Sequence, residues 1–513
     1  MTDRIVIVGD TLLDRDVEGV VNRLCPDAPV PVLDETRAME RPGGAGLAAV
    51  LAARQGLLVG LVTALADDAG GARLSELLTA AGVEVYPLPL PGATTEKIRL
   101  RTGGRVLLRL DRGGGGRTGE PTDETLALLM DATAILVSDY GRGVARQPAL
   151  RAALERGPAP VVWDPHPRGP AAVPGIRLAT PNEAEVRELA GASGSRARLL
   201  AATRGAQALR ERWRAGAVAV TMGRDGALLC HAGDTPLVVP APVKADGDTC
   251  GAGDQFAVAA TIALARGALV SEAVEEAVAR ASTYVADGGV ATVLPNPPAH
   301  PAAGDLHPVG PPAPFPWAAE PLPDTATAGP ASGRPGVRSA TAAAERIGPD
   351  AAGALVARVR AAGGIAVATG GCFDLLHAGH VSTLQAAREQ GDCLIVCLNS
   401  DASVTGLKGP DRPLVPQADR ARLLAALGCV DAVVIFDEPT PHAVLSWLRP
   451  DVWVKGGDYG TGGGDEPDLP EADLVQRWGG QTVVVPYLDG RSTTSMIAAA
   501  RSGRPPNRAR GAS

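Results

Sequence analysis

Short apolar runs alternate with longer helical stretches along most of this chain. Such alternation predicts parallel strands that are buried by helices on both faces of a sheet. A further pair of strand-like segments, 97–102 and 106–111, flanks Gly103 and Gly104 and predicts a hairpin outside that sheet. The strands expected in the first part are 4–10, 57–63, 134–140, 160–165 and 217–223, and the helices are 46–56, 124–132, 183–191 and 254–267.

One segment lacks this apolar periodicity and divides the chain. Residues 296–350 are dense in proline, alanine and glycine. They cannot bury enough apolar surface to offset the entropy lost on folding, so we interpret them as a disordered linker. The alternation then resumes and predicts a smaller doubly wound domain, with its ligand at the carboxyl ends of the strands. The predicted organisation is α/β, with one domain at 1–295, a second at 351–502, a disordered tail at 503–513, and second-domain strands at 365–369, 392–399, 432–436, 452–457 and 482–487.

The bulk properties restrict the possible classes of protein. A chain of 513 residues exceeds what one hydrophobic core usually serves. A net charge of −8, without a long basic run in the body of the chain, argues against a nucleic-acid partner. No signal peptide and no run long enough to span a bilayer are apparent, so we expect no membrane partner. The seven scattered cysteines form no CxxC pair, which favours reduced thiols in the cytoplasm.

Glycines precede the helix expected at 254–267, in the sequence DTCGAGDQF at 248–256. They leave the backbone unobstructed, so successive amides can point at a phosphate that the helix dipole also favours. Asp254, in the first helical turn, can accept the proton of an attacking hydroxyl while those amides hold the transferred phosphate. The alternative is that Asp254 only caps the helix.

Other segments also place glycines or polar side chains where a strand ends or a helix begins. They are a glycine turn at 41–46, two aspartates after the first strand, and the sequence TPNEAE at 180–185. In this order, the elements resemble the ribokinase-like (PfkB) sugar kinases over nearly all of residues 4–295. The resemblance implies that Asp254 is the catalytic base, that ATP is the phosphate donor, and that Asn182 and Glu185 hold Mg²⁺ through water. It also implies nucleotide and anion contacts at Thr221, Gly223, Thr249, Gly251, Ala252 and Gly253, and sugar contacts at Asp10, Asp14, Gly43, Gly44, Lys97 and Arg109.

Two positions depart from the kinase pattern. Leu47 stands where family members commonly have an asparagine that touches the sugar, and His166 stands where the most similar pattern reads DPK. These departures leave the sugar, and the activity of the kinase half, open. Lys97 and Arg109 could also lie on a solvated face of the hairpin.

The sequence GCFDLLHAGH at 371–380 places His377 and His380 where a strand becomes a helix. A metal site would need further ligands, and only Cys372 is near. A phosphate site fits better, because nucleotidyl transfer needs donors aimed at the α-phosphate and the leaving pyrophosphate. Imidazole suits that role and can carry a proton near neutral pH. Lys408 in a glycine-proline loop, and hydroxyls at 492–494 that enter a helix, add further phosphate ligands, although capping or turn chemistry explains each alone.

Together these segments resemble the cytidylyltransferase-like nucleotidyltransferases. The resemblance implies that His377 and His380 stabilise the transition state and that Mg²⁺ is needed. It extends nucleotide contacts to Gly371, Phe373, Asp374, Lys408, Lys455, Asp458, Ser492, Thr493 and Thr494.

The whole chain resembles the bifunctional heptose-7-phosphate kinase/heptose-1-phosphate adenylyltransferases. That resemblance implies phosphorylation of heptose 7-phosphate at O1, a separate phosphatase, and then ADP-heptose synthesis from ATP. It also allows a homodimer through the hairpin at 97–111. A sugar kinase of other specificity joined to a cytidylyltransferase, and a sensor without turnover, remain as alternatives. Because the phosphatase acts between the two reactions, we expect the two halves to work when they are separated.

Overall fold

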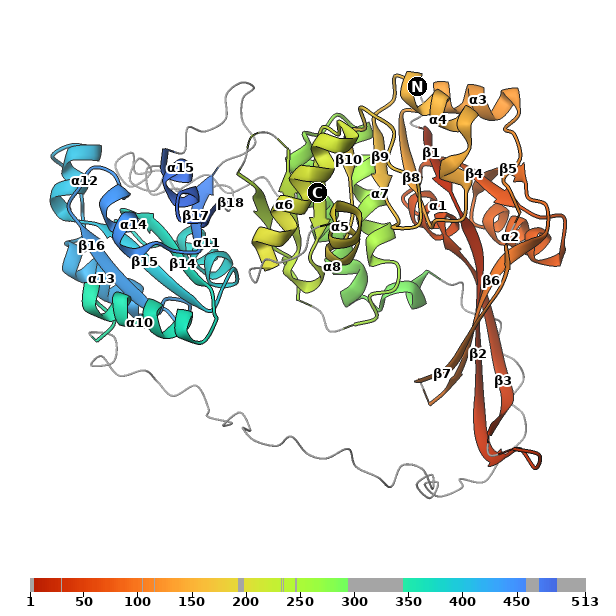
Figure 1. Cartoon of the computed structure of the whole chain (residues 1–513), viewed down its shortest axis with the longest axis horizontal. Helices are drawn as coiled ribbons and strands as arrows, with labels where there is room; N and C mark the ends of the chain where they lie inside the picture. The colour runs from red at the N-terminus through yellow and green to blue at the C-terminus, as the bar shows by residue number, and fades with distance from the viewer. Residues whose placement is uncertain are drawn as a thin grey trace, which may run out of the picture.

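The structure is a computed structural model with two parallel-sheet domains, joined at one sheet edge (Figure 1). Among the residues it describes, we find no helix with both the length and the apolar character that a bilayer crossing requires. The described residues are 4–486, without 29, 104, 115, 192–197, 232, 234, 245–246, 294–344 and 458–469.

The main sheet of the first domain has the order β13-β12-β11-β10-β9-β8-β1-β4-β5. All its neighbours from β11 to β5 are parallel, and β12 and β13 extend it as an antiparallel meander. The five strands predicted for this domain are confirmed. The strands are β1 (Arg4–Gly9), β4 (Leu58–Leu65), β5 (Val83–Pro89), β8 (Ala134–Ser138), β9 (Val161–Asp164), β10 (Leu178–Ala179), β11 (Val218–Thr221), β12 (Ala227–Cys230) and β13 (Leu237–Val239).

Helices cover both faces of this sheet, as the alternating pattern predicted, and two hydrophobic clusters lie on its opposite faces. The long helix α7 is buried along most of its length against β8 and β9. The helices are α1 (Ala45–Ala53), α2 (Ala69–Ala80), α3 (Asp123–Met130), α4 (Pro148–Arg156), α5 (Glu183–Ala190), α6 (Arg198–Trp213), α7 (Ala252–Ala265) and α8 (Val270–Ala286).

A second sheet of four strands projects from the body of the first domain (Figure 1). Its order is β3-β2-β6-β7, and the antiparallel pair β6–β7 confirms the predicted hairpin. The long strands β2 and β3 were not predicted. The bounds are β2 (Thr11–Leu24), β3 (Pro31–Gly44), β6 (Ala93–Thr102) and β7 (Arg105–Gly114).

The second domain is a parallel sheet of order β16-β15-β14-β17-β18, and all five of its predicted strands are confirmed. Ile347 pairs with Val433, so this domain includes residues ahead of the boundary predicted at 351. The linker and tail predictions fall mostly on residues outside the described ranges. The elements are α10 (Pro349–Ala361), β14 (Ala366–Gly371), α11 (Ala378–Arg388), β15 (Cys393–Asn399), α12 (Asp401–Lys408), α13 (Gln417–Ala426), β16 (Ala432–Phe436), α14 (His442–Leu448), β17 (Val452–Gly457), α15 (Pro470–Gln476) and β18 (Gln481–Pro486).

The edge strands β13 and β18 pair in parallel and join the two sheets into one of 14 strands. Leu237 and Val484 are register partners, and Val484 donates its amide to the carbonyl of Pro236 at 3.1 Å. The side-chain amide of Gln481 donates to the hydroxyl of Thr203 at 2.5 Å. Each domain thereby covers an edge that would otherwise be open to another strand.

Candidate active sites

Helix α7 begins behind a glycine turn, as predicted. Its N-cap Gly251 has φ 82°, the left-handed region where a side chain would strain the backbone. A Cβ at Gly251 would also lie 2.7 Å from the hydroxyl of Tyr284 and 2.9 Å from Leu47, whereas one at Gly253 would meet nothing within 4 Å. The turn is therefore packed on one side and open on the other, where a phosphate can approach the amides.

Asp254 lies in the first turn of α7 and is only 6% exposed. Its carboxylate oxygens accept hydrogen bonds from the hydroxyl of Tyr140 at 2.9 and 3.0 Å. The pKa of Asp254 is raised to about 7. Burial is the largest cause and the charge of Asp14 adds to it, whereas the Tyr140 hydrogen bond and the charge of Lys97 oppose it. A carboxylate with a pKa near neutrality is well matched to the role of general base.

A pocket of about 160 Å³ lies beside this helix start. Phe256, Val278 and Val285 give it an apolar wall, which suits a nucleotide base. The pocket brings together five of the predicted nucleotide and anion contacts: Thr221, Gly223, Thr249, Ala252 and Gly253.

The predicted magnesium residues begin helix α5. Asn182 and Glu185 form a capping box, in which each side chain accepts the other's backbone amide at 3.0 and 2.8 Å. Asn182 also pairs with Thr221, so this helix start adjoins the nucleotide pocket. Burial, then the charges of Glu185 and Asp254, raise the pKa of Asp164 well above its usual range.

Among the described residues, no group of three or more His, Cys, Asp or Glu side chains is arranged to hold a metal ion. The pKa of Glu185 is nevertheless raised, chiefly by burial. Asp164 and Glu185 thus form an excess of partly buried carboxyl groups, which a divalent cation that shares its shell with phosphate and water would relieve.

The aspartates and glycines predicted to contact the sugar do meet at the start of the four-stranded sheet. A Cβ at Gly43 would lie 2.7 Å from the carboxylate of Asp14, and one at Gly44 would lie 2.4 Å from the carbonyl of Asp10. Asp14 is buried and forms an ion pair with Arg99 at 3.1 Å. The close approach of the strands therefore requires glycine at 43 and 44.

Asp10 is held differently from Asp14. Its carboxylate accepts the backbone amides of Tyr140, Arg142 and Val144 at 3.2, 2.9 and 3.0 Å. It thus fixes the loop after β8, including Tyr140, whose hydroxyl reaches Asp254. Its contact with the sugar remains a prediction.

The two predicted cations of the hairpin have different surroundings. Lys97 is partly buried opposite Asp14, and burial is the main cause that lowers its pKa. Arg109 is 56% exposed on β7 and pairs with Asp111. The structure therefore favours a site role for Lys97 and the solvated-face interpretation for Arg109.

The two departures from the kinase pattern are both accommodated by packing. Leu47 is buried, with its side chain against the turn at Gly251. The Nδ1 atom of His166 accepts the amide of Arg168 at 3.1 Å. Burial, followed by the charge of Arg168, lowers the pKa of His166, so it is mostly neutral at neutral pH.

In the second domain, β14 ends at Gly371 and α11 begins at Ala378, with His377 as its N-cap. The rings of His377 and His380 are stacked, with centroids 3.9 Å apart and an interplanar angle of 23°. The ring of Phe373 lies 5.3 Å from that of His380. The predicted pair of imidazoles is thus formed at a helix N-terminus.

The pKa of His380 is lowered to about 4. Burial is the largest cause, the charges of His377 and Lys408 act in the same direction, and a hydrogen bond with the backbone of Leu375 opposes them. His380 is therefore neutral at pH 7 in the free protein, in contrast to the protonated state allowed by the sequence. Lys408, the last residue of α12, is close enough for its charge to act on this ring. An anionic ligand would counteract these repulsions and raise the pKa of His380.

Asp374 is engaged in contacts within the protein rather than open to a ligand. It is buried, pairs with Arg412, and accepts the amides of Leu414 and Val415 at 2.7 and 3.0 Å. It therefore ties the histidine loop to the loop that follows α12. A direct nucleotide contact of Asp374 remains a prediction.

Arg420 was not predicted, yet it is fully buried beneath the histidine loop. It donates to the carbonyls of Cys372 and Asn399 and pairs with Asp401 at 2.7 Å. The predicted contact Lys455 pairs with Glu471 at 2.9 Å. The predicted contacts Asp458, Ser492, Thr493 and Thr494 lie outside the described residues.

Comparison with known proteins agrees with this geometry. The family model of the pfkB family carbohydrate kinases matches residues 2–297, and the cytidylyltransferase-like family model matches residues 368–469. The Bifunctional protein HldE of Streptomyces coelicolor is 52% identical over 98% of both chains. The chain belongs to the bifunctional HldE family. HldE proteins of Halorhodospira halophila and Caulobacter vibrioides are 38% and 35% identical, over 97% and 96% of both chains.

Membership of the HldE family confirms a carbohydrate kinase joined to a nucleotidyltransferase. It also confirms the predicted fold class, with a ribokinase-like first domain and a cytidylyltransferase-like second domain. Among solved structures, Arabidopsis thaliana ribokinase complexed with ribose and ATP is 21% identical, with a TM-score of 0.47 over 57% of this chain and 96% of that chain.

Proposed function

We propose that this enzyme performs two steps of ADP-heptose synthesis. In the first, the kinase domain transfers the γ-phosphate of ATP to O1 of heptose 7-phosphate. In the second, the phosphate oxygen of heptose 1-phosphate attacks the α-phosphorus of a second ATP, so that the bond to the β-phosphate breaks and pyrophosphate leaves. The observation that carries the proposal is the presence, in one chain that aligns end to end with HldE proteins, of both a buried base at Asp254 and an imidazole pair at His377 and His380.

The kinase step is supported by the position of Asp254. Its pKa of about 7 lets it accept the proton of the 1-hydroxyl, while the amides of the glycine turn hold the phosphate. Lys97 adds a positive charge near the same carboxylate. When bound, Mg²⁺ would neutralise phosphate charge, and Asn182, Glu185 and the nearby Asp164 are the residues that fit it.

The adenylyl step needs no base, because the attacking sugar phosphate is already ionised. It needs donors for the negative charge that develops on the α-phosphate and pyrophosphate. His377 and His380 lie at the start of α11, and Lys408, at the end of α12, is close enough to act on His380, so the three can supply them. The kinase product still carries its 7-phosphate, so a separate phosphatase must act between the steps. Since both steps consume ATP, we place them in the cytoplasm.

We further propose that the kinase domain forms a homodimer through β7. This strand is the outer edge of the four-stranded sheet, and Val106, Leu107, Leu108 and Leu110 on it are each between 45% and 57% exposed. An unpaired edge that carries large apolar side chains favours association with another strand. Leu108→Glu should shift the protein from dimer to monomer in sedimentation velocity, and a wild-type monomer would contradict this proposal.

The test of function is a coupled synthesis. Purified protein is offered heptose 7-phosphate, ATP and Mg²⁺, then a sugar bisphosphate phosphatase, and ADP-heptose is sought by mass spectrometry. Replacing ATP with CTP in the second step should abolish pyrophosphate release. Preferential use of CTP, or phosphorylation only of another sugar, would instead favour a different kinase and cytidylyltransferase pairing.

A further inference from the structure

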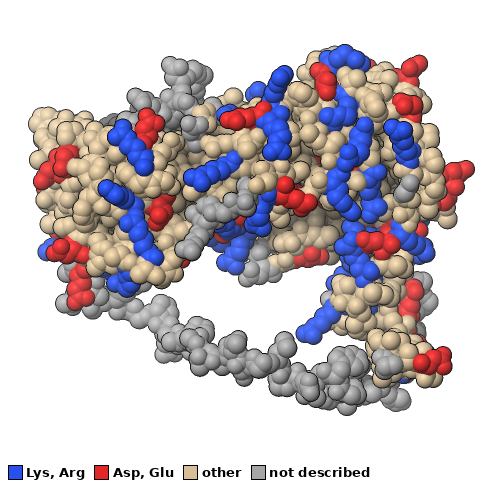
Figure 2. All heavy atoms as spheres, viewed as in Figure 1, with Lys and Arg blue, Asp and Glu red and all other residues tan. Residues whose placement is uncertain are grey.

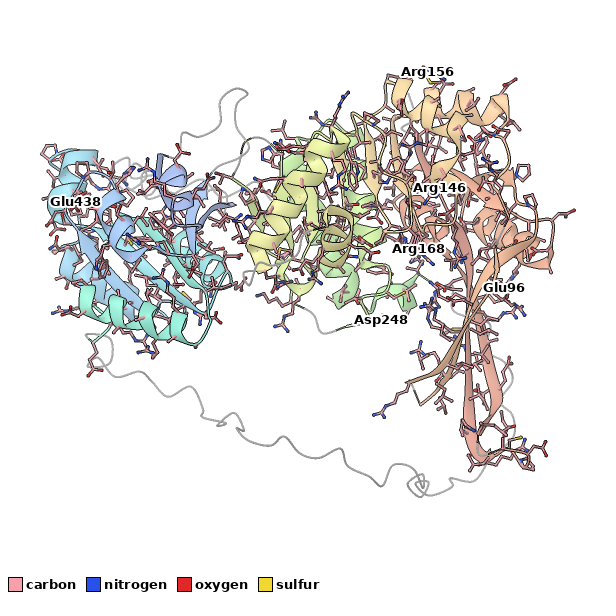
Figure 3. All side chains as sticks on the ribbon, in the orientation of Figure 1. Glu96, Arg146, Arg156, Arg168, Asp248 and Glu438 are labelled. Atoms are coloured by element: carbon pink, nitrogen blue, oxygen red, sulfur yellow. The ribbon has the colours of Figure 1, made fainter. Side chains whose placement is uncertain are left out.

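A second cavity of the kinase domain lies where the four-stranded sheet meets the body of the domain. It measures about 290 Å³, and Figure 3 labels Arg168 at this junction. Figure 2 shows Lys and Arg side chains gathered over the first domain on the face turned to the viewer. We call it the arginine cavity, and its polar lining comprises Asp10, Thr11, Thr95, Arg142 and Arg168.

Two arginines line this cavity without a carboxylate partner among the described residues. Arg142 donates from Nη1 to the hydroxyl of Thr95 at 3.2 Å, and no ion pair of Arg142 or Arg168 with a carboxylate is found in the described part of the chain. Burial is the main cause that lowers the pKa of His166, the charges of Arg168 and Arg142 lower it too, and Asp10 and Glu188 oppose them. Two unpaired arginines that converge on one cavity favour an anionic occupant.

The backbone around the arginine cavity is arranged to admit these side chains. Gly114 has φ +80°, and a Cβ there would lie 3.4 Å from Nη1 of Arg142. Gly141 has φ +71°, and a Cβ there would lie 2.9 Å from the Cβ of Arg168. Glycine at these positions thus leaves room for both arginines to reach the cavity.

An unsatisfied hydroxyl also lines the arginine cavity. Thr11 is 4% exposed, and its Oγ1 atom has no hydrogen-bond partner among the described residues. A buried polar atom without a partner is costly unless a ligand or water supplies one. Phosphate oxygens can accept hydrogen bonds from both the hydroxyl and the guanidinium groups.

Two of the carboxylates near this cavity are already engaged, and a third, Asp139, accepts the amide of Gly141 with one oxygen while the other has no hydrogen-bond partner among the described residues. Asp10 accepts three backbone amides, as described above. Glu96, which Figure 3 labels on the four-stranded sheet, pairs with Arg112 at 2.8 Å. Neither Asp10 nor Glu96 therefore pairs with Arg142 or Arg168, so the two guanidinium groups remain available to an anion.

We propose that the arginine cavity binds the phosphate at the far end of the sugar substrate, through Arg142, Arg168 and the hydroxyl of Thr11. Tyr140 connects it to the reaction centre, because its amide donates to Asp10 at the cavity and its hydroxyl donates to Asp254. A seven-carbon sugar with its O1 at Asp254 can thus place its 7-phosphate among the arginines. This assignment rests on the proposed function, since it takes the substrate to be a sugar phosphate.

The assignment also explains one departure from the kinase pattern. The pattern led us to expect a lysine at position 166, where this chain has a histidine that is mostly neutral. Arg168, two residues further on, supplies a positive charge to the cavity instead. The kinase then discriminates sugar phosphates from free sugars through Arg142 and Arg168.

The test compares Arg168→Gln and Arg142→Gln with the wild-type full chain. The KM for heptose 7-phosphate should rise about 10- to 100-fold in each, because each loses charge-assisted hydrogen bonds to phosphate. The KM for ATP and the rate of adenylyl transfer should not change. Arg142→Lys keeps the charge without the fork and should give an intermediate KM. The matched control is Arg156→Gln, an exposed arginine at the end of α4 that does not line the cavity.

A second readout separates this inference from the proposed function. Thermal stabilisation is measured with heptose 7-phosphate and with unphosphorylated heptose, in wild type and in Arg168→Gln. Stabilisation that requires the phosphate and is lost in the variant supports the arginine cavity, even if the wild type fails to phosphorylate O1 and the proposed function is wrong. Equal stabilisation by both sugars, or an unchanged KM in both glutamine variants of an active enzyme, overturns the assignment.

Discussion

Tyr140→Phe tests whether Asp254 acts as the base whose ionisation limits the kinase. The hydroxyl of Tyr140 donates to both oxygens of Asp254, at 2.9 and 3.0 Å, and removal of one oxygen atom leaves the buried ring in place. This hydrogen bond opposes the effect of burial, which raises the pKa of Asp254 to about 7. Its loss should therefore raise that pKa further.

The magnitude follows from the strength of a hydrogen bond to a charged group, about 1.5–3 kcal/mol. At 1.36 kcal/mol per pKa unit, the pKa of Asp254 should rise by about one to two units in the variant. The ionised fraction at pH 7 then falls from about one half to between about 1% and 10%. Because the base must be ionised to react, kcat/KM at pH 7 should fall about 5- to 50-fold, and at pH 9 it should recover to between about half and nine tenths of its plateau.

The assay is the pH profile of kcat/KM for the sugar, since that ratio reports the ionisation of the free enzyme. The acid limb should move to higher pH in Tyr140→Phe while the plateau at high pH stays near the wild-type value. Adenylyl transfer provides an internal control in the same preparation, because Tyr140 lies in the kinase domain. An equal loss at every pH, with the limb unmoved, would refute this account of Asp254.

Three other changes have defined outcomes. Asp254→Asn should abolish phosphorylation yet stabilise the protein by about 4 kcal/mol at pH 8 in thermal unfolding. The pKa of Asp254 is raised from 3.8 to about 7, so the protonated carboxyl stabilises the wild-type fold at low pH, and this stability is lost as the pH rises through 7. The stability gained by Asp254→Asn should therefore vanish towards pH 4. Arg420→Met should destabilise the second domain by about 2–5 kcal/mol in calorimetry, because it leaves two carbonyls unpaired in the interior, without changing the kinase rate. Cleavage within 300–345 should leave both rates intact, with the halves still associated through Leu237 and Val484 in gel filtration. Loss of either rate would show that the domains depend on the linker.

The strands of the main sheets could be predicted because parallel strands buried on both faces read as continuous apolar runs. The run from 392 to 399 became β15, whose residues are all buried. Strand β2 escaped prediction because two of its charged residues, Asp14 and Asp16, are buried through cross-strand pairs. Asp16, for example, is paired with Arg41 on β3 and Arg99 on β6. That compensation depends on partners distant in sequence, so it leaves no periodic signal.

The same distinction separates the predicted and unpredicted site residues. Asp254 and the histidine pair lie next to glycines in the chain, so local sequence indicates their chemistry. Tyr140 is 114 residues from Asp254, and Arg420 is 48 from Cys372. Tyr140 did stand at the carboxyl end of a predicted strand, which was a usable signal. Arg420 gave none, because its role arises only when three loops meet around it.

Burial disfavours the charged form of the side chain at both Asp254 and His380. A bound ATP, however, acts on the two side chains in opposite ways. For Asp254 a nearby phosphate makes ionisation harder, so the positive charge of Lys97 is needed close by. For His380, with a pKa of about 4, a phosphate makes protonation easier. Protonating this ring at pH 7 requires a shift of about three units, or about 4 kcal/mol. One phosphate charge at 4 Å supplies about 4 kcal/mol at an effective dielectric constant of 20.

ATP binding to the second domain should therefore take up about half a proton or more at pH 7. Titration calorimetry in buffers of different ionisation enthalpy measures this uptake, without sugar so that no turnover occurs. Asp254→Asn serves as the background, because it removes uptake at the kinase base, and the added change His380→Asn should abolish the remainder. Equal uptake in the two proteins would mean that His380 stays neutral against the bound triphosphate. The transition state would then be stabilised by imidazole dipoles and Lys408 rather than by an imidazolium.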